Sequence, residues 1–378
     1  MLALLCFSCT SGQEGANAPP VPPPPATTDS LTPYYGSYAS ADGDMFVVAR
    51  LGWFFDLRDS AYRTIYATAL PDRFTIGFRF AVPLPKFADL TFGQGTLRVN
   101  QGSARRIAYK QSDVTIRADG ADLAATITDP ASPGLHPGIV VVHGSERGQR
   151  FFYDIWVGIY TNLGLSVLTY DKRGGGDSTG TYPGEFPTED ALKIYADDAS
   201  TALAFLARWP GVDPKHVGFH GGSQGGWTVP LAMFRHPQAA FAVLVSAPAT
   251  TVDQTDLWSS FSDGGAVMPT QSTAEMQAAV RATHSGYDPT PALQALSVPA
   301  LWLLGSNDRT VPTAICVEIL TGMHKSNFTI RMVPTGHGLL VNPTGLGADD
   351  DRSFGLAPAL VPDLKDWFRA ESIQPPAS

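Results

Sequence analysis

The chain has 378 residues, of which 44% are hydrophobic and 16% are charged, and its formal net charge is −9. This length fits one domain of roughly 250 residues plus a smaller companion domain. An acidic chain without a cluster of Lys or Arg repels phosphate backbones, which excludes nucleic acid as an expected partner. Of the three cysteines only Cys316 lies in the predicted folded region, so we expect neither a disulfide nor a cysteine-based metal site.

Residues 1–29 have the composition of a signal-like segment followed by a Pro-rich tether. Met1–Phe7 is apolar, and Ser8-Cys9 resembles a bacterial lipoprotein cleavage site, although Cys6 stands where such sites usually have Leu. The basic residue expected before an apolar export signal is missing. We expect a protein that is exported or lipid-anchored at Cys9; the alternative is a disordered tail on a cytoplasmic protein. No later segment is apolar for long enough to span a bilayer.

Residues 30–110 contain short runs of aromatic and β-branched residues separated by Gly, Pro and Asp. The runs are Met45–Val48, Thr64–Tyr66, Phe74–Phe80 and Thr96–Val99. Such runs are typical of short strands joined by turns. The pattern predicts a small β-rich accessory domain, and nothing in it resembles a catalytic motif.

From residue 111 to 378 the pattern changes to strands that alternate with helices. The expected strands after an entry hairpin are Ile139–Val142, Leu165–Tyr170, Val217–His220, Phe241–Val245, Ala300–Leu304 and Phe328–Val333. Ile139–Val142 is continuously apolar, as expected for a strand covered on both faces. This alternation predicts an α/β domain with a mostly parallel, doubly wound sheet and helices on both faces.

The strongest motif is Gly221-Gly222-Ser223-Gln224-Gly225, which follows a predicted strand and opens a predicted helix. That setting is typical of a nucleophile elbow, in which a sharp turn projects a serine above the sheet. Gly221 and Gly225 suit the turn because side chains there would crowd it. The motif predicts Ser223 as a nucleophile.

A serine hydroxyl needs a general base, and in this arrangement an acid and then a histidine follow the nucleophile in the chain. Asp308 and His337 each follow the end of a predicted strand, at the edge where such sheets build sites. We expect His337 to take the Ser223 proton and Asp308 to orient and stabilise the imidazole.

Other acids and histidines compete for these two roles. Asp171 and Asp177 follow an earlier strand and compete with Asp308. The competing histidines are His143, His220 and His324. His220 is too near Ser223 in the chain and is expected to pack beneath the elbow, whereas His324 precedes its strand and should lie at the opposite edge.

An oxyanion hole requires two backbone donors. The first is expected to be the N–H of Gln224. The second should come from the loop His143–Gly148, where Ser145 is the preferred candidate and Gly144 the second. A plain strand-to-helix turn would have a similar sequence.

These motifs, in this order, resemble the α/β-hydrolase superfamily over residues 111 to 375. The loop at His143-Gly144, the stretch Asp171–Gly180, the Ser223 elbow and the loops at Asp308 and His337 carry the likeness. The nearest groups are bacterial serine esterases close to the dienelactone-hydrolase and serine-aminopeptidase groups. Dienelactone hydrolases proper use Cys where this chain has Ser223, which argues against dienelactone as substrate. The resemblance implies that Asp171–Gly180 is a structural turn.

We therefore expect a serine hydrolase that cleaves small-molecule carboxylic esters through an acyl-enzyme, without cofactor or metal. A peptidase, an acyl-peptide hydrolase or a thioesterase would use the same three residues. A non-catalytic binding module would require a broken triad, and none of the three positions is broken. Residues 249–297 are long enough for a short cap, with Trp258, Phe261 and Tyr287 as apolar anchors.

Overall fold

The computed structural model describes residues 24–58, 60–79, 82–184, 187–341 and 356–373. The signal-like segment, the lipid anchor at Cys9 and most of the Pro-rich tether fall on residues 1–23, outside these ranges. None of the helices within the described ranges has both the length and the apolar character needed to cross a membrane.

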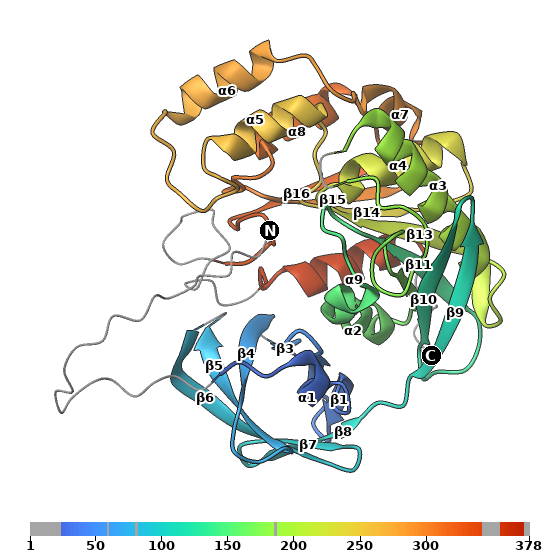
Figure 1. Ribbon diagram of the computed structural model, residues 1–378. Helices are drawn as coiled ribbons and strands as arrows, with labels where there is room; N and C mark the ends of the chain where they lie inside the picture. The colour runs from blue at the N-terminus through green and yellow to red at the C-terminus, as the bar shows by residue number, and fades with distance from the viewer. Residues whose placement is uncertain (1–23, 59, 80–81, 185–186, 342–355, 374–378) are drawn as a thin grey trace.

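The N-terminal domain is a closed antiparallel barrel (Figure 1). Closure occurs because β1 pairs with β2 on one side and with β8 on the other. Its strands are β1 (Gly36–Ser40), β2 (Met45–Ala49), β3 (Trp53–Asp56), β4 (Ala61–Ala67), β5 (Arg73–Arg79), β6 (Val82–Gly93), β7 (Thr96–Val99) and β8 (Gly102–Arg106). The β-rich N-terminal domain expected from the sequence is therefore a barrel.

Residues 24–29, which the sequence assigned to the tether, pair with this barrel. The Ala26 amide donates to the Ile65 carbonyl at 2.8 Å, and the Ala67 amide donates to the Pro24 carbonyl at 3.0 Å. Thr27 caps the short helix α1 (Thr28–Leu31), whose Leu31 is buried in the barrel core. The barrel unit thus begins before residue 30.

Both faces of strand β2 are buried, and this joins the barrel to the rest of the molecule. Phe46 and Val48 point into the barrel core, whereas Val47 and Ala49 belong to a core shared with helix α2 (Asp154–Asn162). This alternation follows from the two-residue period of a strand. Next to it, Arg50 donates to both carboxylate oxygens of the buried Asp154 at 2.7 and 2.9 Å.

The C-terminal domain, which begins at β9, is built on an eight-stranded mixed sheet in the order β16-β15-β14-β13-β11-β12-β10-β9. The strands are β9 (Lys110–Ala118), β10 (Ala121–Asp129), β11 (His136–Val142), β12 (Ser166–Tyr170), β13 (Val212–Gly222), β14 (Ala242–Val245), β15 (Ala300–Gly305) and β16 (Phe328–Val333). The entry hairpin β9–β10 is antiparallel, and the neighbouring pairs from β12 to β16 are parallel. The expected mostly parallel sheet is confirmed.

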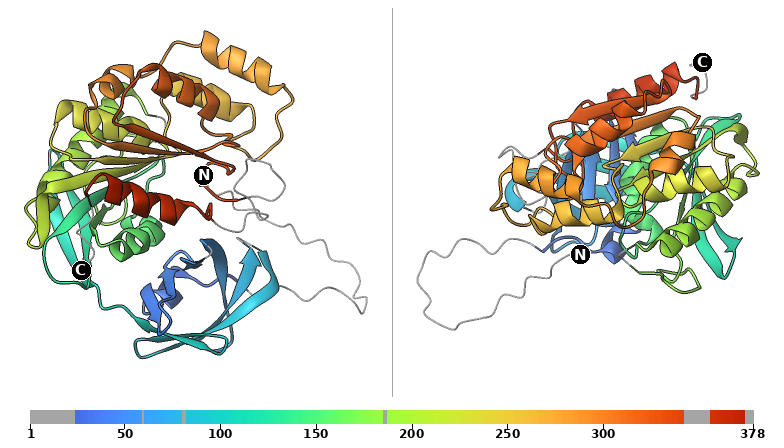
Figure 2. Two further views of the ribbon diagram at one scale, coloured as in Figure 1. Left: turned by 180° about the vertical axis from the view of Figure 1, so that it is seen from behind. Right: turned by 90° about the horizontal axis from the view of Figure 1, so that it is seen from above.

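Helices cover both faces of this sheet, which gives two separate cores (Figures 1 and 2). One core holds apolar residues of α3 (Glu189–Leu206), α4 (Gly225–Arg235), α7 (Thr290–Ala295) and α8 (Thr313–Gly322). The other holds those of α2, α9 (Leu360–Ala370) and the outer face of the barrel. The barrel therefore lies beyond α2 and α9, on the side of these helices away from the sheet.

The segment between β14 and β15 carries two further helices, α5 (Val252–Ser260) and α6 (Thr273–Ala282), which pack against each other (Figure 1). Each begins with a capping box, formed by Thr251 with Gln254 and by Ser272 with Glu275. Because β13 to β16 are parallel, their carboxyl ends meet at one edge, and residues of this segment line hollows there.

Candidate active site

Ser223 lies on a tight turn between strand β13 and helix α4. Its backbone has a φ of 51°, a left-handed conformation that is unfavourable for a residue with a side chain. The Ser223 amide donates to the Val245 carbonyl at 3.0 Å, and its carbonyl accepts from the Gly226 amide at 2.7 Å. A side chain at Gly221 would place a Cβ atom 2.7 Å from the Gly225 carbonyl oxygen. The turn therefore has the geometry of an elbow and needs glycine at Gly221.

The structure brings the three predicted catalytic side chains into one hydrogen-bonded chain. Ser223 Oγ lies 3.0 Å from His337 Nε2, and His337 Nδ1 lies 2.8 Å from Asp308 Oδ2. These residues follow β13, β15 and β16, and in the sheet β14 separates β13 from β15, which is the neighbour of β16. The parallel sheet thus brings Asp308 and His337 to Ser223, although they lie 85 (308 − 223) and 114 positions further along the chain.

One oxygen of the Asp308 carboxylate is held by its own loop. Its side chain is buried, and Oδ1 accepts hydrogen bonds from the amides of Thr310 and Val311, both at 2.8 Å. The second oxygen is left for His337. Trp258 of α5 donates from its indole to the Asp308 carbonyl at 3.2 Å, which ties the loop to the α5 segment. This arrangement holds the acid in one orientation.

The competing acids have other partners. Asp171 is buried and accepts from the Arg150 amide at 2.7 Å, from the Arg150 guanidinium at 2.5 Å and from the Asp177 amide at 2.8 Å. Asp177 is exposed and pairs with Arg150 at 3.2 Å. These bonds close the Asp171–Gly180 turn and leave Asp308 as the acid next to His337.

The competing histidines are also occupied or distant. His143 is buried, with Nε2 bonded to the Tyr170 carbonyl and Nδ1 3.3 Å from Glu146. His324 lies in the turn before β16, at the opposite edge of the sheet. His220 is buried beneath the elbow, where its Nδ1 bonds the Tyr160 hydroxyl at 2.8 Å. Among these histidines, His337 is the one that reaches Ser223.

Burial of His220 leads to a prediction about stability. Desolvation lowers the pKa of this imidazole to about 3, from an ordinary value of 6.5. The unfolded chain therefore binds a proton between these values and the folded chain does not, so lowering the pH through this window favours unfolding. Between about pH 8 and pH 5 we expect His220 to remove about 2 kcal/mol from the free energy of unfolding. Urea denaturation at both pH values should show a smaller pH dependence in His220→Gln than in the parent; equal slopes would contradict the prediction.

The loop after β11 approaches the elbow closely. A Cβ atom on Gly144 would lie 3.5 Å from Ser223 Cβ. The Gly144 amide donates to the Tyr153 hydroxyl at 3.0 Å, whereas the Ser145 amide has no hydrogen-bond acceptor among the described residues. Ser145 lines the same hollow as Ser223 and Gln224. The Ser145 amide, the preferred candidate from the sequence, is thus available to a ligand, whereas the Gly144 amide, the second candidate, is occupied.

Lys172 connects this loop to the elbow, a contact that the sequence did not reveal. Its buried ammonium donates to the Gly144 carbonyl at 2.7 Å and to Gln224 Oε1 at 2.8 Å, and it lies 4.2 Å from the centre of the Tyr195 ring. One charge therefore holds together the two segments that carry Ser145 and Gln224. In the sequence, Lys172 is one residue of the Asp171–Gly180 stretch, and nothing there distinguishes a buried lysine from an exposed one.

Ser223 opens into a hollow of about 200 Å³. Its walls are Ser145, Pro187, Gln224, Trp227, Pro248, Thr255, Asp256, Ser259, Thr310 and Val311. Within the described ranges no group of three or more His, Cys, Asp or Glu is arranged to hold a metal ion.

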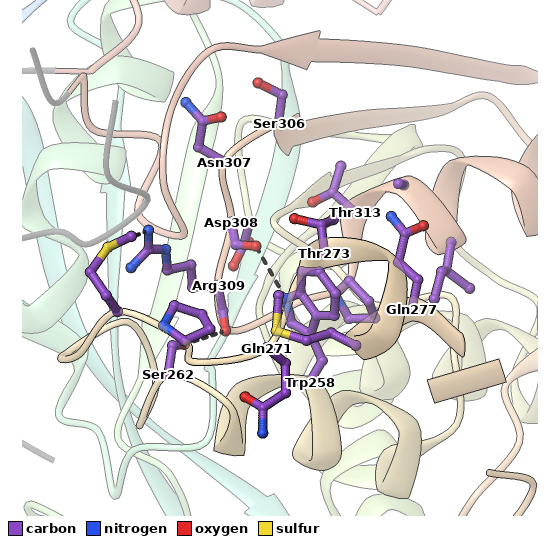
Figure 3. Close-up of a pocket in the computed structure, with 16 residues that line it drawn as sticks. Trp258, Ser262, Gln271, Thr273, Gln277, Ser306, Asn307, Asp308, Arg309 and Thr313 are labelled. Carbon is purple, nitrogen blue, oxygen red and sulfur yellow. Dashed lines mark hydrogen bonds between the residues drawn. The ribbon is translucent and has the colours of Figure 1, made fainter. Parts of the chain in front are cut away.

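A second cavity, of about 300 Å³, is lined in part by Asp308 and Arg309 of the acid loop (Figure 3). Trp258 and Ser262 line it from the α5 segment, and Gln277 lines it from α6. Figure 3 shows the Trp258 indole bonded to the backbone of Asp308. The acid loop contributes to both hollows, because Asp308 and Arg309 line this cavity and Thr310 and Val311 line the one at Ser223.

The sheet, the elbow and the Ser223–His337–Asp308 arrangement define an α/β-hydrolase of the serine type, as the resemblance implied. Residues 153–342, half of the chain, match the prolyl oligopeptidase family. The chain belongs to this family. The matched region contains Ser223, Asp308 and His337.

Similar proteins span several kinds of hydrolase. The thiohydrolase aneE of Aspergillus aculeatus is 32% identical over 92 residues, which are 24% of this chain and 28% of that protein. The human acylamino-acid-releasing enzyme is 25% identical over 230 residues, which are 57% of this chain and 30% of that protein. The chain thus spans less than a third of either relative. An uncharacterized protein of Mycobacterium tuberculosis, Rv2307c, is 25% identical over 241 residues, 62% of this chain and 75% of that protein.

Among solved structures, the esterase Pf2001 of Pyrococcus furiosus has a TM-score of 0.51 and 16% sequence identity. The match covers 70% of this chain and 92% of that one. At this identity the likeness establishes the shared fold.

Proposed function

We propose that this protein cleaves carboxylic esters of small molecules through an acyl-enzyme, with Ser223 as nucleophile, His337 as general base and Asp308 as the acid. The observation that carries the proposal is the continuous chain of hydrogen bonds at 3.0 and 2.8 Å from serine to histidine to aspartate. A base within hydrogen-bond reach, itself oriented by a third group, is what activates a serine hydroxyl.

In the proposed reaction Ser223 Oγ attacks the substrate carbonyl while His337 Nε2 takes the hydroxyl proton. Collapse of the tetrahedral intermediate breaks the bond to the leaving group, which receives that proton from His337. Water then attacks the acyl-enzyme, again losing a proton to His337, and the carboxylic acid is released as Ser223 recovers its proton. Asp308 stabilises the imidazolium during both formation and hydrolysis of the acyl-enzyme.

We assign the oxyanion hole to the backbone amides of Gln224 and Ser145. Gln224 directly follows the nucleophile and precedes helix α4, whose N-terminus favours negative charge. The Ser145 amide is the available donor of the facing loop. Gly221 and Gly225 shape the elbow that brings the donors near Ser223.

A hollow of about 200 Å³ lies below the usual size of pockets for drug-sized ligands, which favours a small acyl group. The α5 segment contributes Thr255, Asp256 and Ser259 to its wall, so we propose that residues 249–297 act as a short cap. Export, with lipidation at Cys9, remains a proposal from the sequence alone.

Peptide-bond cleavage is the second candidate, because the chain belongs to the prolyl oligopeptidase family and one relative is named an acylamino-acid-releasing enzyme. The same triad would serve, with an amine as leaving group. A thioesterase is a further alternative, in line with the name of the thiohydrolase relative.

A burst assay separates these candidates. Purified protein is mixed with p-nitrophenyl acetate, butyrate and octanoate, and in parallel with aminoacyl and N-acetylaminoacyl p-nitroanilides and an acyl thioester. We expect a burst of p-nitrophenol equal to the enzyme concentration, with faster turnover of acetate and butyrate than of octanoate. Turnover of anilides without turnover of esters would overturn the ester proposal in favour of the peptidase.

Lys172 gives a prediction about the oxyanion hole. Lys172→Met should lower kcat about 10- to 100-fold and change KM less than about threefold, because the amides of Ser145 and Gln224 lose their common anchor. The control is Arg147→Met. This change also removes a cation, but Arg147 lies in the loop that carries Ser145 and donates to the Gly174 carbonyl, away from Gln224. Steady-state kinetics on p-nitrophenyl butyrate provides the test; a rise in KM at constant kcat would contradict this role.

A further inference from the structure

Asp256 is a charged residue that is exposed to solvent and contributes to the wall of the Ser223 hollow. No other Asp, Glu, Lys, Arg or His is among the lining residues that the structure describes. Asp256 lies on α5 together with Thr255 and Ser259, which line the same hollow. The spacing of three and four residues puts Ser259 on the same helix face as the other two.

Asp256 has no visible structural task. Within the described ranges its carboxylate makes no hydrogen bond and no ion pair. The N-terminus of α5 is already capped by Thr251 and Gln254, and Asp253 supplies the acidic residue of the first turn. Asp256 lies one turn further on, where the helix dipole has little effect.

An uncompensated carboxylate in this place opposes the proposed reaction. The tetrahedral intermediate carries a negative charge on oxygen, and a second negative charge in the same hollow repels it. Partial desolvation in the wall of the hollow and the neighbouring Asp253 raise the pKa of Asp256, as expected for a carboxylate without a cationic partner. A positive charge on the substrate would remove this penalty, and an ammonium with N–H groups would also add a charge-assisted hydrogen bond.

We infer that Asp256 selects substrates that carry an organic ammonium group close to the scissile carbonyl. The inference rests on the proposed function, because it assigns a substrate class to the Ser223 hollow. Trp227, Pro187 and Pro248 in the same wall offer apolar surface to the carbon atoms around such a cation. The net charge of −9 also favours the approach of cations over anions.

Two matched pairs of esters test this inference and show on which side of the ester bond the cation lies. Acetylcholine is compared with its uncharged carbon analogue 3,3-dimethylbutyl acetate, which places the cation on the leaving group. Alanine benzyl ester is compared with N-acetylalanine benzyl ester, which places it on the acyl group. Hydrolysis is followed by pH-stat at about pH 7. In at least one pair the parent should show a kcat/KM about tenfold or more higher for the cationic ester. For alanine benzyl ester this is the effect of one hydrogen bond from its ammonium to a carboxylate, whereas the quaternary ammonium of acetylcholine has no N–H group and contributes charge attraction alone.

Asp256→Asn keeps the shape of the side chain and removes its charge. It should lower kcat/KM for the cationic ester about tenfold or more, whereas kcat/KM for the neutral ester should not fall, because the repulsion between Asp256 and the intermediate is removed. Hydrolysis of the neutral ester at or above the parent's rate also shows that the variant is folded. Asp263→Asn is the matched control, because it removes one charge from the same segment, outside the hollow, at a left-handed position that asparagine tolerates. The control should keep the parent's preference.

A parent that hydrolyses the neutral esters but shows no cationic preference in either pair would overturn the inference and leave the proposed function standing. Equal losses for both esters of a pair in Asp256→Asn would overturn it as well. If no ester is hydrolysed, the proposed function fails, and binding of phenyltrimethylammonium by isothermal titration calorimetry decides the inference. We then expect binding at least fivefold weaker in Asp256→Asn, and equal affinities would reject the assignment.

Discussion

Replacing Ser223 with alanine is expected to lower kcat about a millionfold, because the acyl-enzyme cannot form. The oxyanion hole can then assist only direct attack of water on the bound ester. This is the largest effect predicted for any residue of the chain. The measurement is single-turnover and steady-state hydrolysis of p-nitrophenyl butyrate, together with labelling by a fluorophosphonate probe, which should mark the parent at Ser223 and leave the variant unmarked.

The fold should tolerate this change. The left-handed backbone at residue 223 strains alanine and serine alike, since both carry a Cβ atom. The substitution removes one partly buried hydrogen bond to His337, so the free energy of unfolding should change by no more than about 1 kcal/mol. If the Ser223→Ala variant has an unchanged melting temperature and a kcat within tenfold of the parent's, Ser223 is not the nucleophile.

Replacing Asp308 with asparagine is expected to lower kcat about ten-thousandfold. The asparagine amide can still accept from the Thr310 and Val311 amides, so the loop should keep its shape. It would then present an NH₂ group to His337 Nδ1, which favours the tautomer that protonates Nε2. The nitrogen that faces Ser223 would no longer accept its proton.

Asp177→Asn is the matched control for Asp308→Asn. Asp177 is the competing acid that can be changed with little structural consequence, because it is exposed and Arg150 keeps its shorter ion pair with Asp171. Its kcat should stay within about twofold of the parent. A loss in Asp177→Asn as large as that in Asp308→Asn would mean that the acid had been assigned to the wrong loop.

The comparison between sequence and structure separates local from long-range information. Ser223, Asp308 and His337 could be selected from the sequence because each follows an apolar strand in a loop of characteristic composition. The ends of parallel strands meet at one edge, so local position along the chain implied proximity in space. The same reasoning placed His324 at the opposite edge, where the structure has it.

The remaining features depended on contacts between segments that are far apart in the chain. Nothing local indicates that Asp171 is held by Arg150, or that Lys172 reaches Gln224, 52 positions away. The β-rich pattern predicted short strands, but only the pairing of β1 with β8 made them a barrel, and only the outward face of β2 placed that barrel against α2.

The sequence by itself thus determined the α/β class, the strand order along the chain and the three residues of the hydrogen-bonded chain. Alternation, turn residues and strand ends are properties of short segments, and short segments are what a sequence displays directly. The tertiary structure alone decided which donor of the Gly144–Ser145 loop is available and which carboxylate enters the Ser223 hollow. These depend on burial and on charge partners, which arise only when distant segments pack together.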